Sequence, residues 1–160
     1  MSDKKMGSVI SALITLIIFV GVPYMLPQYL PPNIADMASE AGIDLPSFLN
    51  QIMVLGGVTA AITLVKGFVD KTGGIYLLAS IAQNVSALAF TVVFLGIGNY
   101  ASLGLTEYTI DMGGAVSHIT MDLRVFIYLT VGVVCLRIIQ SYFEWNEAKV
   151  EAAPPGRIPP

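Results

Sequence analysis

Residues 75–97, IYLLASIAQNVSALAFTVVFLGI, form the stretch that decides the fold class. The stretch slightly exceeds the roughly 20 apolar residues that a helix needs to cross a bilayer. It lies within a longer segment, from Lys71 to Glu107, that contains no charged residue between its ends. This length and composition are typical of a membrane span, so we expect residues 75–97 to form one.

Three further apolar stretches with few charges cover residues 8–26, 48–69 and 123–145. Only 12% of the 160 residues are charged, compared with about 25% in soluble domains. This composition excludes a disordered chain, a nucleic-acid binder and a soluble enzyme domain. The sequence therefore predicts an all-α integral membrane protein with four transmembrane helices, in a single membrane domain of residues 1–148.

The connections between the spans differ in kind. The DKTGG stretch at 70–74 predicts a tight turn, which makes the second and third spans an antiparallel hairpin. Four prolines follow or lie within the end of the first span, and we expect them to end that helix: Pro23, Pro27, Pro31 and Pro32. A short helix at the membrane surface is expected within 33–47, with Ser47 as the N-cap of the second span. Residues 149–160 are rich in proline and predict a flexible tail.

Residues 105–123 carry a strand pattern instead of a helix pattern. Two stretches rich in Thr, Ile, Tyr and Val flank Gly113-Gly114, and in each stretch the side-chain type alternates from one residue to the next. This arrangement predicts a small β-hairpin outside the membrane. Because an isolated two-stranded hairpin is only marginally stable, we expect it to pack on the 27–47 segment or on hairpins of neighbouring subunits.

The distribution of basic residues predicts the orientation. Lysines and arginines gather at the N-terminus, around the second-to-third turn, and late in or after the fourth span: Lys4, Lys5, Lys66, Lys71, Arg137, Lys149 and Arg157. The other two connections are acidic, and Arg124 is the single exception. The positive-inside rule then predicts a multi-pass protein of the cell membrane with both termini cytoplasmic and the hairpin extracytoplasmic.

Polar residues within the spans are the candidate functional residues, because each is costly in a bilayer without a partner. They recur at helical spacing in the third and second spans: Ser80, Gln83, Asn84 and Thr91, and Thr59 and Thr63. The functional interpretation is the lining of a pore or of a polar solute site. The alternative is hydrogen bonding between packed helices.

Two charges and one pair of small residues complete the candidates. Lys66 and Arg137 are candidate functional cations, or else anchors that extend to the membrane surface or form ion pairs with nearby carboxylates. Gly57 and Ala61 have the small-xxx-small spacing that lets two helices approach closely.

The sequence shows no pattern of catalytic residues. The single cysteine, Cys135, excludes an intrachain disulfide, and the single histidine, His118, cannot form a metal site alone. We therefore expect no enzyme activity, no cofactor and no metal. Four spans with a β-rich outer connection resemble the tetraspan tight-junction architecture, but the tryptophan and cysteine pair that those proteins carry in their first outer loop are missing here.

Two functions remain open. In the first, the chain assembles as an oligomer that forms a pore or permeation path for ions or small solutes. In the second, it is a non-catalytic structural or accessory subunit of a larger membrane complex. The expected partners are the lipid bilayer and either further copies of the chain or other membrane subunits, and no nucleic acid.

Overall fold

The computed structural model describes residues 3–97, 104–111 and 116–152. Within these residues, four helical segments are long and apolar enough, by length and composition, to cross a membrane. They cover Lys5–Tyr29, Leu45–Phe68, Gly74–Leu95 and Arg124–Ala152. The expectation of four such helices is confirmed, and their bounds lie close to the predicted ones except that the fourth runs on to Ala152, into the predicted tail.

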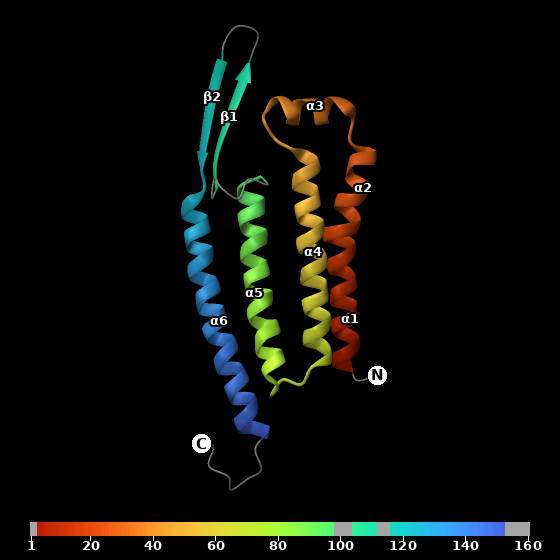
Figure 1. Cartoon of the computed structure of the whole chain (residues 1–160), viewed down its shortest axis with the longest axis vertical. Helices are drawn as coiled ribbons and strands as arrows, with labels where there is room; N and C mark the ends of the chain where they lie inside the picture. Colours follow the sequence, from red (N-terminus) through yellow and green to blue (C-terminus); the bar gives the residue numbers. More distant parts are fainter. Residues whose placement is uncertain (1–2, 98–103, 112–115, 153–160) are drawn as a thin grey trace.

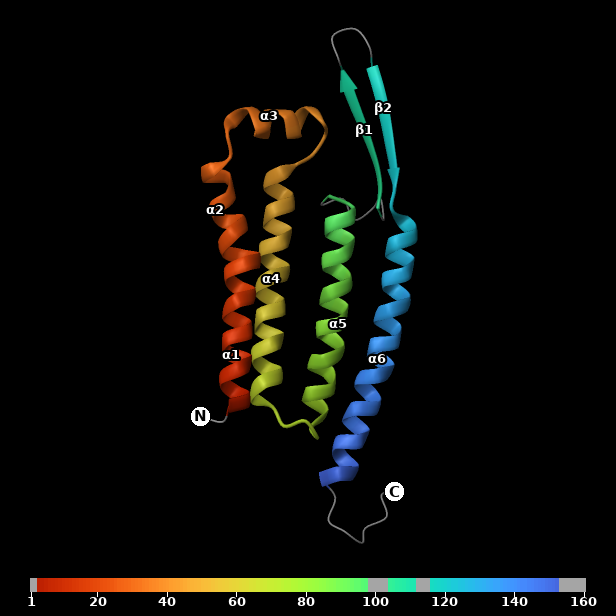
Figure 2. The ribbon, with the colours of Figure 1, turned by 180° about the vertical axis from the view of Figure 1, so that it is seen from behind.

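The four segments stand in a row (Figure 1). The first consists of α1 (Asp3–Leu16), η1 (Ile17–Gly21) and α2 (Val22–Tyr29), and is followed by α4 (Leu45–Phe68), α5 (Gly74–Leu95) and α6 (Arg124–Ala152). Among the described residues, extensive contacts join α1 with α4, α4 with α5, and α5 with α6, and Figure 2 shows the same order from behind. Only 11% to 22% of the residues in the most apolar part of each segment are buried within the chain. The row is therefore open, with most of its apolar surface left for lipid or for other chains.

Two of the four prolines, Pro23 and Pro27, do not end the first segment, contrary to the prediction, whereas the helix does end just before Pro31 and Pro32. Pro23 lies at the start of α2 and Pro27 lies inside it, and the helical path continues to Tyr29. Pro23 has no N–H to offer the carbonyl four residues earlier, so an ordinary α-helix would leave that group without a partner. A π-helical turn, η1, comes directly before Pro23, and in it the Val22 N–H donates to the Ile17 carbonyl.

Helix α3 (Pro32–Glu40) lies across the end of the row, beside the end of α4 (Figure 1). Gly42 follows it with φ +78°, a conformation that glycine adopts without steric cost. The predicted N-cap of the second span is wrong. The cap is Asp44, whose Oδ1 accepts the Ser47 N–H at 3.1 Å, and the helix begins at Leu45.

Strands β1 (Leu105–Asp111) and β2 (Val116–Asp122) pair antiparallel, with Leu105 opposite Asp122 and Asp111 opposite Val116. Gly113-Gly114, the expected turn, lies outside the described residues. The strands extend beyond the helices at the end where α3 lies, and the start of α1 and the end of α6 lie at the other end (Figure 1). The hairpin is expected to pack on the 27–47 segment, but among the described residues the two make no extensive contact.

Close packing between the first segment and α4 depends on glycines. A Cβ built on Gly56 would lie 2.5 Å from the Cβ of Phe19, and one built on Gly67 would overlap the Ser8 side chain. The predicted pair does not make this contact: a Cβ on Gly57 would meet no atom within 4 Å, and Ala61 is exposed. Gly57 and Ala61 therefore stay candidates only for a contact between chains.

Candidate polar groove

Three adjoining hollows, which we call the polar groove, lie along the row of helices. Their volumes are about 390, 540 and 320 Å³. Gln83 lines all three, Lys66 lines the first and third, and Asn84 and Arg137 line the second and third. Residues from the two ends of the row, Thr15 and Arg137, line the same 540 Å³ hollow, so this hollow lies across one face of the row.

Most of the predicted polar residues meet in this groove. Seven of the eight polar and charged candidates line it: Thr59, Thr63, Lys66, Ser80, Gln83, Asn84 and Arg137. Thr91 does not line these hollows, and its hydroxyl donates to the Ala87 carbonyl of its own helix. The structure thus brings candidates from three helices to one surface, which their spacing along single helices did not establish.

Lys66 connects α4 with α5. Its Nζ donates to Oε1 of Gln83 at 3.1 Å, and the same ammonium lies 5.3 Å from the ring centroid of Tyr76. The ammonium thus gains an amide oxygen and the negative face of an aromatic ring, two partners that suit a cation at membrane depth. The expected ion pair of Lys66 with Asp70 does not form among the described residues.

Three polar contacts organise the other side of the groove. Asn84 on α5 donates from Nδ2 to Oγ of Ser141 on α6, at 3.4 Å. Gln140, which directly precedes Ser141, donates from Nε2 to Oε1 of Glu144 at 2.8 Å. Trp145 then donates from Nε1 to the Thr72 carbonyl at 3.0 Å, which fixes α6 to the turn before α5.

The Arg137 guanidinium has no hydrogen bond or ion pair within the described part of the chain. It is exposed on α6, yet it lines two of the three hollows together with Gln83 and Asn84. The expected ion pairs with Asp70 or Glu144 do not form there. At 1.5 Å per residue it lies about 20 Å along the helix from Arg124, near the middle of α6 (Arg124–Ala152).

Hydroxyl groups join α4 and α5 at mid-height. The Thr59 hydroxyl donates to the Leu55 carbonyl at 2.8 Å, so Ser86, whose Oγ lies 2.5 Å from that of Thr59, is the donor between them. Thr63 repeats the first pattern with the Thr59 carbonyl. These bonds satisfy the hydroxyls within the chain and hold the two helices together.

Phenylalanines close the groove toward the end where α3 lies. The Phe19 ring lies 4.8 Å from Phe90, Phe90 lies 6.3 Å from Phe94, and Phe94 lies 5.9 Å from Phe48, measured between ring centroids. Because Gly56 has no side chain, Phe19 can cross α4 and reach α5. This aromatic cluster was not identified from the sequence, since phenylalanines in an apolar span carry no distinguishing signal.

Two further residues line the groove, and the single cysteine and histidine of the sequence lie apart from it. Gln140 and Lys5 line the groove without having been singled out. Cys135 is free and exposed, and His118 is exposed on β2, away from the groove. Among the described residues, no group of three or more His, Cys, Asp and Glu side chains is placed to hold a metal ion.

Comparison of the chain with protein-family models, with characterised proteins and with solved structures finds no match. A function for the chain is therefore inferred from the geometry of the groove and of the helix row.

Proposed function

We propose that this chain spans the cell membrane with both termini cytoplasmic, and that several copies assemble around a permeation path for ions or small solutes. The observation that carries the proposal is the gathering of Gln83, Asn84 and Arg137 on one open face of the row. In a bilayer, polar and charged side chains are tolerated where they line a water-filled cavity or face other protein groups. A ring of copies would close the groove and provide that cavity.

The charges of the groove favour small anions as the solute. The 320 Å³ hollow has two cations, Lys66 and Arg137, against one carboxylate, Glu144. The 390 Å³ hollow at the chain's terminal end adds Lys5 and Lys71 against Asp70. Rings of basic side chains select anions in pores. The phenylalanine cluster beyond them would form an apolar constriction of the kind that gates by dewetting.

A flux assay tests the proposal. The purified chain is reconstituted in liposomes, and the efflux of chloride and of a small uncharged solute is measured. We expect efflux that falls at least about tenfold in the variant Gln83→Leu/Asn84→Leu, because apolar side chains would dry the groove. The control is Thr130→Val, which removes a hydroxyl bonded only within its own helix. If liposomes that contain the wild-type protein show no more efflux than empty liposomes, the pore is excluded.

A second function has a specific observation in its favour. Gln83 and Asn84 each bond to a neighbouring helix, to Lys66 and Ser141, which is the arrangement of a packed helix assembly without a path. In that case the chain is a non-catalytic subunit among other membrane proteins. Particle images of the purified complex distinguish the two: a closed ring of one chain supports the pore, and a single copy among unrelated chains supports the subunit.

A further inference from the structure

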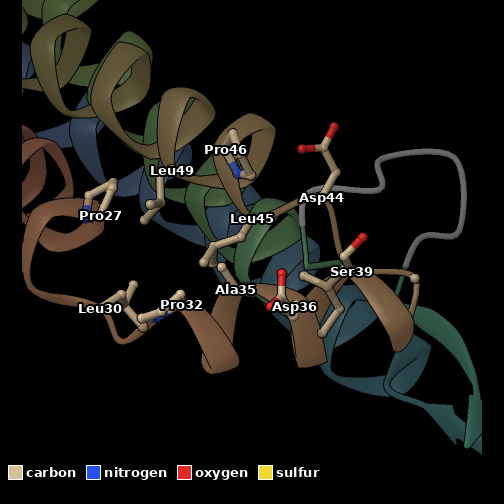
Figure 3. A pocket seen from close by; sticks show the side chains of 12 residues that line it. Pro27, Leu30, Pro32, Ala35, Asp36, Ser39, Asp44, Leu45, Pro46 and Leu49 are labelled. Carbon is tan, nitrogen blue, oxygen red and sulfur yellow. The ribbon is translucent and has the colours of Figure 1, made fainter.

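A pocket of about 830 Å³ lies under α3, at the end of the helices opposite Lys5 and Lys71. It is an open hollow between the end of α2, α3 and the start of α4 (Figure 3). Its volume falls in the range of about 300–1,000 Å³ that is usual for sites that hold drug-sized ligands. The pocket shares no residue with the polar groove, so an inference about it is independent of the proposed pore.

The pocket is lined by apolar side chains and by acidic side chains. Apolar side chains come from all three helices: Pro27 and Leu30, Ala35, and Leu45, Pro46 and Leu49. Leu49 is 5% exposed and forms a packed base. The polar side chains are all oxygen-bearing: Asp36 and Ser39 on α3, and Asp44 just before α4. A ligand that fits must therefore present both apolar surface and a group that carboxylates attract.

The acidic charge has no counterpart in this part of the chain. The sequence contains no lysine, arginine or histidine between Lys5 and Lys66. One oxygen of Asp44 accepts the Ser47 N–H, whereas the Asp36 carboxylate has no hydrogen bond or ion pair within the described residues. A positively charged group of a ligand would gain an ion pair at Asp36 that the chain itself does not supply.

We propose that this pocket binds an organic cation with an apolar body, such as an aryl-alkyl quaternary ammonium. The apolar body would lie against Leu45 and Leu49, and the cationic group would lie beside Asp36, with the charge of Asp44 nearby at the rim of the pocket. A phospholipid is a poorer occupant, because the two carboxylates repel its phosphate.

Calorimetry tests the proposal on the full-length protein in phosphatidylcholine nanodiscs, with empty nanodiscs as the blank. The probe is 3-phenylpropyltrimethylammonium, and the comparison compound is its uncharged isostere with carbon in place of the quaternary nitrogen. We expect saturable binding of the cation, weakened at high salt because the charges are exposed, and much weaker binding of the isostere. Absence of saturable binding above the blank, or equal binding of both compounds, would overturn the proposal.

A matched pair of variants locates the charge. Asp36→Asn should weaken binding by about two- to fivefold, as expected for an exposed ion pair. Glu40→Gln removes the same charge from the same helix but not from the pocket lining, and should leave affinity unchanged. Equal losses in the two variants would mean that only the general acidic surface attracts the probe, and would contradict the site.

A steric variant locates the apolar body. Ala35→Trp places a large side chain in the pocket from an exposed position, so it should abolish binding while the thermal unfolding of the protein stays the same. Ser39→Trp is the second steric variant, one turn further along α3, and should do the same. Full binding by both variants would place the probe elsewhere and overturn the proposal.

Discussion

Lys66 donates a hydrogen bond from Nζ to Oε1 of Gln83 at 3.1 Å, across the contact between α4 and α5. The sequence marks each residue as a separate candidate, one a cation and the other part of a polar stripe. The structure makes them one unit, so that a change in either affects both the packing of two helices and the polarity of the groove. The two roles are separable by experiment.

A double-mutant cycle measures the packing role. Lys66→Met and Gln83→Leu should each destabilise the protein, and the double variant should lose less than the sum, with a coupling of about 0.6–1.7 kcal/mol, as for other polar contacts between membrane helices. The measurement is the free energy of unfolding by denaturant in micelles. The control cycle pairs Gln83→Leu with Lys71→Met, an exposed cation that makes no bond to Gln83, and additive losses are expected there. Additivity in the first cycle as well would show that the bond does not form.

Neighbouring glycines in α4 should respond in opposite ways to alanine. Gly56→Ala should cost about 1–3 kcal/mol, because the new methyl group would collide with Phe19 and overpacking of this kind is destabilising. Gly57→Ala meets open space and should be neutral or stabilising by about 0.5–1 kcal/mol, from the better helix propensity of alanine. Thermal unfolding of the two purified variants checks this, and the reverse order of stability would show that the first segment does not pack on Gly56.

The comparison of sequence and structure shows which information the sequence carries. Composition predicts the four apolar helices within a few residues, because the bilayer demands length and low charge and little else. Rotation of each helix is a different matter. Apolar residues surround most of α4, so periodicity cannot tell whether Gly56 or Gly57 faces the first segment; within the chain the close contact is at Gly56, and the predicted pair of Gly57 and Ala61 stays a prediction.

The predicted end of the first helix and the predicted N-cap of the second are corrected for local reasons. Pro23 and Pro27 are strong helix-ending signals in water, yet the chain passes from a π-helical turn into α2, which continues to Tyr29. Asp44 and Ser47 are both good N-caps, and in the structure the Asp44 carboxylate accepts the Ser47 N–H, so the helix begins three residues before the predicted start. The candidate groove was predicted residue by residue, but its assembly from α4, α5 and α6 depends on contacts between helices that no single helix encodes.

Arg137 should control the ion selectivity of the proposed pore. Arg137→Gln keeps a polar side chain and removes one of the two cations in the 320 Å³ hollow, so the ratio of chloride to potassium permeability should fall several-fold. The reversal potential of reconstituted protein in a potassium chloride gradient measures this ratio. Arg124→Gln is the matched control, because Arg124 pairs with Asp122 at 3.7 Å beside the hairpin and lines none of the three hollows. Cation selectivity of the wild-type protein would refute the proposed preference for anions but would not contradict the proposed pore.

Cysteine labelling in intact cells tests the proposed orientation, which rests on the positive-inside rule. Cys135→Ala first removes the only native thiol. Glu107→Cys then places a thiol at an exposed position on β1, and Glu147→Cys places one at an exposed position on α6 near the chain terminus. A membrane-impermeant maleimide should label the hairpin thiol within minutes and reach the α6 thiol only after the cells are permeabilised. These positions lie at opposite ends of the row (Figure 1), so the reverse pattern would invert the topology, and labelling of both in intact cells would contradict a membrane span between them.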